Sequence, residues 1–248
     1  MAVVDAHVHF GPCRVFGWNM TEEDIISSMD RDGVDASIVQ PFPGTPDAVK
    51  THDEIARLTE KHPGRIFGLA NINPHQDEKF VYKELVRCIK ELGFVAIKCH
   101  TIGHALMPTA KDADVLFETA KELKVPVMVH NAAFGMPFSS PALVIPRAKQ
   151  YPDLPIVIAH TGACVLTPEA IIIAGEYDNL YLETSWVMTP DIKWAIDTVG
   201  ADRVMLGSDS AENLAAEVAK YKVIDITEEQ RRKCMGETAI KLFKLPIK

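Results

Sequence analysis

The chain has 248 residues, of which 47% are hydrophobic, an ordinary value for a globular protein with a large core. Asp and Glu number 34 against 26 Lys and Arg, for a formal net charge of -8. This balance argues against a general nucleic-acid binder, which usually has a basic excess. No apolar run approaches the ~18 residues of a membrane span. No signal-peptide pattern opens the chain, so we expect no membrane partner.

The cysteines indicate a reducing compartment. They are odd in number and include no C-x-x-C pair: Cys13, Cys88, Cys99, Cys164 and Cys234. We therefore expect a cytoplasmic protein without a disulfide framework. Most of these cysteines are expected to be buried and to pack as small hydrophobic residues. Cys13 and Cys164 follow strands that carry candidate site residues, so they are candidates for lining a pocket.

Short apolar runs alternate with longer helical patterns along the whole chain. The predicted strands are VVDAHVHF (3–10), ASIVQP (36–41), IFGLANIN (66–73), FVAIKCH (94–100), PVMVHNA (126–132), PIVIAHTG (155–162), LYLETS (180–185) and RVMLGSDS (203–210). The helical patterns between them open with Thr or Asp and often close on Gly or Asn, as capped helices do. The tail TEEQRRKCMGETAIKLFKL predicts one or two further helices.

This alternation predicts parallel βαβ units. Eight such units in 248 residues match a (β/α)₈ TIM barrel, an α/β fold. We expect one domain over residues 1–248, with an extra C-terminal helix. The alternative is an open doubly wound sheet. That fold would favour a Gly-rich turn after the first strand, and HFGPCR contains no G-x-G-x-x-G.

The first strand carries polar residues where a core strand should be apolar. Asp5, His7 and His9 stand two residues apart, so a regular strand would place them on one face. In a barrel, functional groups gather at the carboxyl ends of the strands. His7 and His9 are therefore expected at the barrel mouth. Asp5 lies deeper and is expected to orient a histidine.

Other strands end on similar residues. His130, His160 and Asp209 end the fifth, sixth and eighth predicted strands, and Lys98 and His100 end the fourth. Taken singly, each has an ordinary explanation: a satisfied core histidine, a helix cap or a strand-end lysine. Together they predict a divalent metal site, and imidazole with carboxylate favours zinc. His52, His62 and His75 fall in helices or at their edges and are expected on the surface.

Two loops offer a substrate pocket. GPCRVFGWNM, after the first strand, carries Arg14, Phe16 and Trp18, and NAAFGMPFSSP, after the fifth, carries Phe134, Met136 and Phe138. These hydrophobes either pack the loops or form an apolar pocket with one cation. The predicted substrate-binding residues are Arg14, Trp18, Lys98, His100 and Phe134.

The motifs DAHVHF, GFVAIKCH, VPVMVHNA, VIAHTG and VMLGSDS together resemble the amidohydrolase superfamily. The resemblance runs nearly the whole chain. It is to the amidohydrolase-related branch, which includes aminocarboxymuconate semialdehyde decarboxylase and the resorcylate-type decarboxylases. It implies one metal ion held by His7, His9, His130 and Asp209, with His160 and Asp209 in catalysis. Two-metal relatives instead use a carboxylated lysine where Lys98 stands, with His160 on the second ion. One ion is favoured.

The resemblance leaves the reaction open. The main prediction is a metal-dependent hydrolase, in which a metal-activated water attacks a small carboxylate-bearing ester, lactone or amide. The alternative is a metal-dependent non-oxidative decarboxylase of an aromatic or unsaturated acid. The third alternative is a non-catalytic ligand-binding barrel. A small-molecule substrate is expected in the first two cases, and a homo-oligomer is possible.

Overall fold

The computed structural model describes residues 2–132 and 137–247. Its strands form one sheet in the order β2-β1-β3-β4-β5-β6-β7-β8-β9. In chain order they are β1 (Val4–Cys13), β2 (Trp18–Met20), β3 (Ala36–Pro41), β4 (Ile66–Ala70), β5 (Ala96–Cys99), β6 (Val127–His130), β7 (Ile156–Ala159), β8 (Leu180–Glu183) and β9 (Val204–Met205). All pairs from β1/β3 to β8/β9 are parallel.

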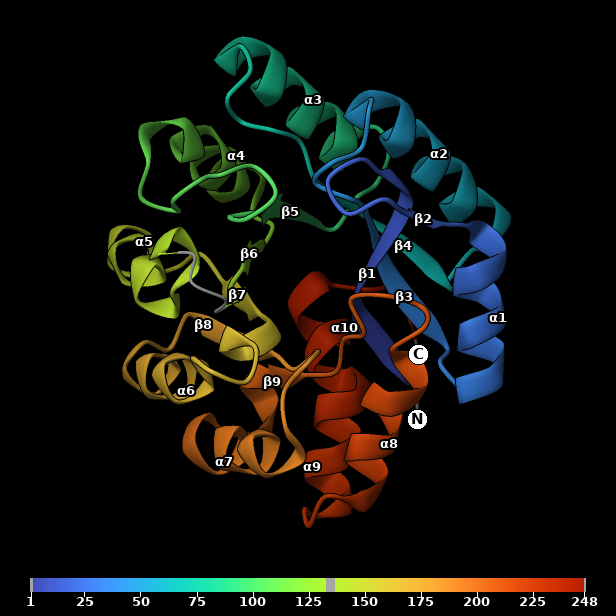
Figure 1. The fold of residues 1–248 in the computed structure, drawn as a ribbon, viewed down its shortest axis with the longest axis vertical. Helices are drawn as coiled ribbons and strands as arrows, with labels where there is room; N and C mark the ends of the chain where they lie inside the picture. Colours follow the sequence, from blue (N-terminus) through green and yellow to red (C-terminus); the bar gives the residue numbers. More distant parts are fainter. Residues whose placement is uncertain (1, 133–136, 248) are drawn as a thin grey trace.

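The sheet closes on itself just beyond β9. A parallel bridge joins Val8 to Asp209, where the Asp209 amide donates to the His7 carbonyl at 2.7 Å and the His9 amide donates to the Asp209 carbonyl at 3.2 Å. The helices form a ring outside the strands, as Figure 1 shows. The predicted (β/α)₈ barrel is therefore confirmed, and the carboxyl ends of its strands meet at one mouth.

A helix follows each parallel strand. The helices are α1 (Glu22–Asp32), α2 (Ala48–Lys61), α3 (Glu78–Lys90), α4 (Asp114–Leu123), α5 (Ile145–Gln150), α6 (Thr167–Glu176), α7 (Thr189–Val199), α8 (Leu214–Val223), α9 (Glu228–Arg232) and α10 (Thr238–Phe243). The sequence contains their start and stop signals: Thr21 and Asp24 form a capping box on α1, and Gly33 ends it at φ 74°. Among the described residues, no helix combines the length and apolar character that a bilayer span requires.

The core has two layers. An inner cluster fills the barrel with residues such as Ile38, Leu69 and Met128, and α10 contributes Leu242 and Phe243 to it. An outer, larger cluster packs the other strand face against the helices. Strands covered on both faces are nearly continuous apolar runs, which explains the sequence pattern.

An irregularity in β1 changes which residues share a face. Its pairing with β3 shifts register between Asp5 and Val8. Val4 and Ala6 pack in the inner cluster, whereas Val8 packs in the outer one, so the alternation slips by one residue. Asp5 therefore does not share the face of His7 and His9, and that prediction is wrong.

Part of the predicted loop after β1 forms a strand. Its end returns as β2, which pairs antiparallel with the end of β1 through Gly11↔Met20 and Cys13↔Trp18. The hairpin was not predicted, because Trp18–Met20 is too short for an alternating pattern. It raises Trp18 over the barrel mouth on a paired backbone.

The expectation that His52 is a surface residue is also wrong. His52 is fully buried, and its Nδ1 donates to Glu84 Oε1 at 2.7 Å, while Nε2 accepts from the Asn71 amide. Arg87 donates to both Glu84 carboxylate oxygens at 2.8 Å. The network joins α2, α3 and the residue after β4. His75 is exposed and His62 is half-buried, as expected for helix edges.

This network predicts acid-sensitive stability. Burial works to raise the pKa of Glu84, but His52 and Arg87 outweigh it and lower the value to about 2. A folded-state pKa below the ordinary 4.5 stabilises the fold above pH 4.5, and that stabilisation is lost as pH falls toward 2. Glu84→Gln should therefore cost ~1–3 kcal/mol near neutral pH.

The measurement is the free energy of unfolding in denaturant at several pH values. The difference between wild type and Glu84→Gln should shrink between pH 4.5 and 2. A difference that stays constant from neutral pH down through this range would show that the Glu84 charge contributes nothing.

Candidate active site

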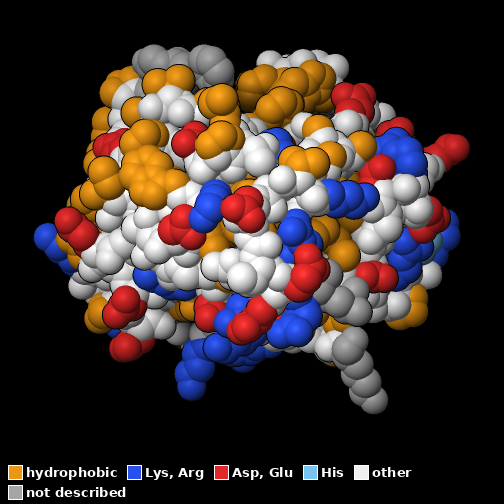
Figure 2. Space-filling model, turned by 90° about the horizontal axis from the view of Figure 1, so that it is seen from below, with side chains coloured by type: hydrophobic (Ala, Val, Ile, Leu, Met, Phe, Trp, Pro, Cys, Tyr) orange, Lys and Arg blue, Asp and Glu red, His pale blue; other side chains and the backbone are white. Residues whose placement is uncertain are grey.

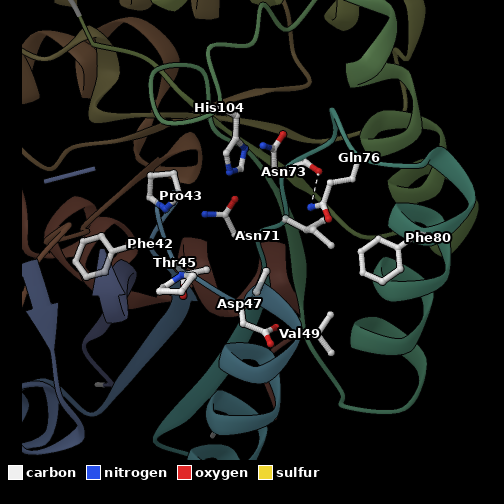
Figure 3. Close-up of a pocket in the computed structure, with 13 residues that line it drawn as sticks. Phe42, Pro43, Thr45, Asp47, Val49, Asn71, Asn73, Gln76, Phe80 and His104 are labelled. Atoms are coloured by element: carbon white, nitrogen blue, oxygen red, sulfur yellow. Dashed lines mark hydrogen bonds between the residues drawn. The ribbon is translucent and has the colours of Figure 1, made fainter. Parts of the chain in front are cut away.

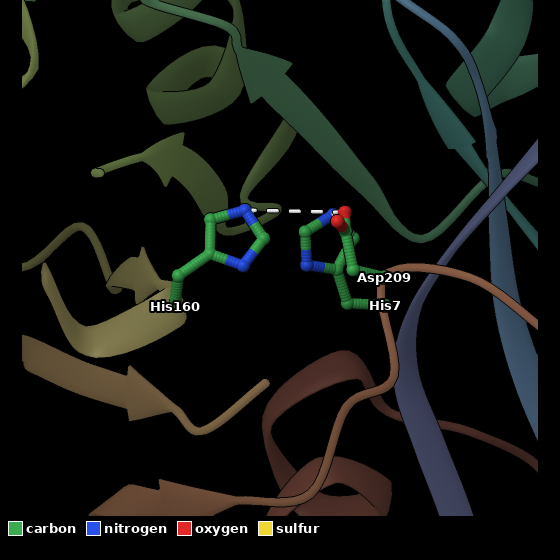
Figure 4. Close-up of side chains that lie close together, drawn as sticks. All are labelled: His7, His160 and Asp209. Atoms are coloured by element: carbon green, nitrogen blue, oxygen red, sulfur yellow. Dashed lines mark ion pairs between the residues drawn. The ribbon is translucent and has the colours of Figure 1, made fainter. Parts of the chain in front are cut away.

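Four histidines and one aspartate gather at the barrel mouth. His7 and His9 lie on β1, His130 ends β6, His160 follows β7 and Asp209 follows β9. Figure 4 shows His7, His160 and Asp209 converging, and their ligand atoms lie within 4.8 Å of one another. His160 and Asp209 have φ values of 62° and 66°, an uncommon left-handed conformation for such residues. The backbone is thus held in an unfavourable form at two of these positions.

Hydrogen bonds fix the tautomers of the two β1 histidines. His7 Nδ1 donates to Glu183 Oε2 at 2.9 Å, and His9 Nδ1 donates to the Pro41 carbonyl at 3.1 Å. With the proton on Nδ1, Nε2 of each neutral ring carries a lone pair. These two lone pairs are the ones that a metal ion would use, and a proton held on Nδ1 by an acceptor is the arrangement that ligating histidines usually show.

Asp209 completes a set of acceptors. Its Oδ2 accepts from the Trp186 indole N–H at 2.9 Å, while Oδ1 lies 3.4 Å from His9 Nε2 and 3.5 Å from His7 Nε2. Two ligands bound tetrahedrally at ~2.1 Å would stand ~3.4 Å apart. The three atoms His7 Nε2, His9 Nε2 and Asp209 Oδ1 are acceptors that carry no proton. Their spacing fits binding to one divalent cation.

His160 and His130 form a second pair beside this set. His160 Nδ1 lies 2.7 Å from Ser185 Oγ, whose own proton goes to Glu183 Oε2. His160 Nδ1 is therefore the donor, and its Nε2 accepts from His130 Nδ1 at 3.1 Å. His130 Nε2 is then a buried lone pair without a partner in the described part of the chain. Burial lowers the pKa of His160 to about 4.

The sequence analysis missed Glu183, the residue that orients this cluster. It is fully buried and accepts from His7 Nδ1, the His160 amide, the Ser185 amide and Ser185 Oγ. A Cβ on Gly207 would lie 2.3 Å from Glu183 Oε1, so only glycine leaves room there. The sequence feature that could have identified Glu183 is an acidic residue at the end of the otherwise apolar strand LYLE. Glu183 takes the role predicted for Asp5, whose carboxylate instead accepts from the His7 and Ser208 backbone amides and Ser208 Oγ.

Lys98 points into the barrel. It is fully buried, and its Nζ lies 3.0 Å from His7 Nε2. Burial lowers its pKa to about 8. The Lys98 ammonium is therefore a cation in direct contact with the His7 ring.

A cavity of about 500 Å³ opens above these groups. Its floor contains His9, His100, His130, His160 and Asp209. Its apolar walls are Phe16, Trp18, Phe42, Pro43, Ile102, Ala132, Ala163, Cys164 and Trp186. Exposed hydrophobic residues continue along the loops after β1, β7 and β8: Val15, Val165 and Met188. Hydrophobic side chains gather along the upper edge of Figure 2.

Some of the predicted pocket residues line the cavity, and others do not. Trp18, His100 and Cys164 line the cavity, whereas Arg14, Lys98 and Cys13 are not among the lining residues. Arg14 is exposed to solvent. Phe134 and Met136 lie outside the described residues, and Phe138 is half-buried in the turn Pro137–Ser139.

Comparison with known families agrees with this geometry. The family model described as Amidohydrolase matches residues 4–245. The chain belongs to the amidohydrolase family. The match spans the barrel from β1 to the residues after α10 and confirms the family resemblance.

Individual relatives are decarboxylases. The chain is 27% identical to the γ-resorcylate decarboxylase of Polaromonas sp. (strain JS666), covering 90% of this chain and 83% of the relative. It resembles the solved 5-carboxyvanillate decarboxylase of Novosphingobium aromaticivorans, bound to manganese and 4-hydroxy-3-methoxy-5-nitrobenzoic acid (TM-score 0.79, 19% identity, 98% and 96% of the two chains). The dihydroxybenzoic acid decarboxylase of Polaromonas sp. JS666, with manganese and 2-nitroresorcinol, gives a TM-score of 0.77 at 20% identity over 98% and 97%.

These comparisons correct two predictions. The main prediction of a hydrolase is wrong, because the curated relative and these solved relatives are decarboxylases. A divalent metal agrees with the relatives, but zinc is not supported, because both solved relatives contain manganese. Both solved relatives also contain a bound small molecule, which agrees with the expected class of partner.

Proposed function

We propose that this chain is a metal-dependent, non-oxidative decarboxylase of a hydroxylated single-ring aromatic acid. The observation that carries the proposal is an apolar, aromatic-walled cavity that ends on imidazole and carboxylate side chains. The chain is also related over 90% of its length to a γ-resorcylate decarboxylase. A volume of about 500 Å³ lies within the range of small-molecule sites and accommodates one substituted ring.

The cavity walls suit a flat ring. Trp18 and Phe16 stand 5.0 Å apart at their ring centroids, and Phe42 lies edge-on to Trp18 at 6.0 Å. Offset and edge-to-face contacts with a substrate ring are favourable in such a slot. The described lining residues include no Lys or Arg, so the substrate's negative charge requires a counter-ion at the floor.

The acceptors at the floor would hold that counter-ion. His7, His9 and Asp209 would bind a divalent ion, with His130 as a further ligand, and one ion per chain fits these residues. Such an ion supplies positive charge that binds substrate oxygens and draws electron density from the ring. Glu183 and Pro41 keep the two β1 imidazoles in the required tautomer.

His100 is placed to bind a substrate oxygen. Its Nδ1 accepts from the Gly103 amide at 3.2 Å, so in the neutral ring Nε2 carries the proton. Burial among other imidazoles keeps the pKa of His100 well below its ordinary value, and the ring is therefore neutral. A neutral N–H donor at the floor favours a hydroxyl or carboxylate oxygen on the ring.

We assign proton transfer to His160. The bond between the ring carbon and the carboxylate breaks, its electron pair stays on the ring carbon, and carbon dioxide leaves. His160 Nε2, a lone pair in the neutral ring, takes up a proton from water and passes it to that carbon, which restores the neutral ring. Because burial lowers the pKa of His160 to about 4, the protonated ring gives up its proton readily, and Ser185 holds the ring from behind.

The test is an assay of manganese-loaded protein with dihydroxybenzoates in D₂O. Decarboxylation releases carbon dioxide and places one deuterium on the carbon that lost it. Benzoate, which lacks the hydroxyls, should react far more slowly. The methyl ester of the same dihydroxybenzoate should not react. Ester hydrolysis without carbon dioxide release would reject the proposal.

His160→Ala provides a separate prediction. The variant should retain the metal ion but lose activity by ~10²-fold or more, the usual effect of a lost acid–base group. Metal content by mass spectrometry and the initial rate are measured together. A variant with normal metal content and a normal rate would remove His160 from the reaction.

A further inference from the structure

A second pocket lies behind the wall of the main cavity. It has a volume of about 360 Å³ and lies between the loops that follow β3 and β4. Phe42 and Pro43 line both spaces. Figure 3 shows Asn71 and His104 near its centre, with Phe42 on one side and Phe80 on the other. The decarboxylation proposed above does not use this pocket.

Two buried acceptors in the pocket lack partners. Asn71 is 2% exposed; its Nδ2 donates to the Pro41 carbonyl at 2.8 Å, which fixes the amide orientation, and its Oδ1 has no partner among the described residues. His104 is 6% exposed, and burial lowers the pKa of its ring to about 4, so the ring is neutral. In the described part of the chain its Nδ1 has no partner, and with the ring proton on Nε2 it is an acceptor.

Unpaired buried acceptors indicate a ligand that donates. A buried polar atom without a hydrogen bond is costly, and a pocket of this size holds more than a single water. The amides of Asn73 and Gln76 add adaptable polar contacts at the edge. Phe80, which is exposed, and Phe42 offer aromatic surface.

Charge selects against ionic ligands. The described lining residues include no Lys or Arg, and the Asp47 carboxylate repels an anion. Asp47 accepts from the Lys50 amide as the cap of α2, so the positive end of the α2 dipole offsets its charge and leaves little attraction for a cation. A neutral ligand fits best.

We propose that this pocket is a second binding site for a neutral planar ring that carries N–H or O–H donors. The donors pair with Asn71 Oδ1 and His104 Nδ1, and the ring packs between Phe42 and Phe80. Carboxamides and uncharged phenols share this chemistry. The site does not depend on the decarboxylase reaction.

The pocket is coupled to the metal-binding cluster by two contacts. The Pro41 carbonyl accepts from both Asn71 Nδ2 and His9 Nδ1. The Phe42 ring stacks on the His9 ring, with centroids 4.7 Å apart and planes 10° apart. A ligand that moves Asn71 or Phe42 would therefore act on the position of the His9 ring.

The experiment uses benzamide, whose two N–H groups match two acceptors, and titration calorimetry on the full chain. Wild type should bind benzamide. N,N-dimethylbenzamide, which lacks donors, and benzoate, an anion, should bind ~10-fold more weakly or worse. Asn71→Leu removes one acceptor, and Val49→Trp fills the pocket from its half-buried edge; both should weaken benzamide binding by ~10-fold or more.

Trp186→Ala is the matched control, because Trp186 lines the main cavity and not the second pocket. It should leave benzamide binding unchanged. Val49→Trp decides the outcome if Asn71→Leu does not fold. No benzamide binding by wild type, or binding that Trp186→Ala abolishes while Val49→Trp preserves it, would overturn the proposal. Neither outcome bears on carbon dioxide release, so the decarboxylase proposal is tested separately.

Discussion

Replacing His7 with alanine is expected to remove the bound metal and abolish turnover together. His7 Nε2 is a lone pair facing Asp209 Oδ1 at 3.5 Å, and the ring is fully buried, so alanine leaves that side of the site without a nitrogen ligand. The loss should exceed the ~10- to 100-fold that removal of a supporting hydrogen bond costs. Metal content after dialysis and the rate of carbon dioxide release measure the two effects.

His75→Ala is the matched control for this prediction. His75 is an exposed histidine outside the cluster, paired with Asp112 on the surface. It should keep both metal and activity. Thermal unfolding of both variants shows whether loss of metal follows from loss of the fold. A folded His7→Ala protein with full metal content would reject the assignment of His7 as a ligand.

Much of the fold could be predicted from the sequence because each element carries its own local signals. The strands are short apolar runs, such as Ala36–Pro41, whose limits match the prediction. The histidines stand out because polar residues rarely interrupt such runs. Strand ends in a barrel converge, so His7, His130, His160 and Asp209 could be brought together without knowing any contact.

The errors come from features that depend on partners far away in the chain. The face of Asp5 changed because β1 slips its register against β3. His52 is buried because Glu84, 32 residues away, pairs with it. Arg14 was assigned to the pocket by proximity to β1, but the β1–β2 hairpin presents Trp18 to the cavity and leaves Arg14 in solvent. Local patterns contain none of this information.

The reaction could not be predicted from the site residues. Imidazoles and a carboxylate around a divalent ion suit either attack by water or release of carbon dioxide. What differs is the cavity: aromatic walls of Phe16, Trp18, Phe42 and Trp186 come from three separate loops. Loop residues pack according to tertiary context, so the sequence alone left packing and ligand contact equally open.

Glu183→Gln is expected to have the second largest effect, although Glu183 would touch no metal. The glutamate accepts four hydrogen bonds through its two oxygens. Glutamine replaces one acceptor with an N–H₂ donor of nearly the same shape. At the Oε2 position that donor would face His7 Nδ1–H and the His160 amide, and at the Oε1 position it would face the Ser185 amide.

Relief from this clash favours the wrong tautomer of His7. Moving the His7 proton to Nε2 lets Nδ1 accept from the glutamine, but it removes the lone pair that faces Asp209. Metal affinity should therefore fall by ~10- to 100-fold. Stability should fall by ~1–3 kcal/mol, because a buried donor loses its acceptor.

Glu84→Gln separates these two effects. Glu84 is also a buried glutamate that accepts from a histidine Nδ1, at 2.7 Å from His52, but it lies outside the barrel mouth. Both variants should lower the free energy of unfolding, measured in denaturant without metal. Glu183→Gln alone should weaken metal binding, measured by competition with a chelator. Equal metal affinities in the two variants would show that Glu183 supports the fold and does not position His7.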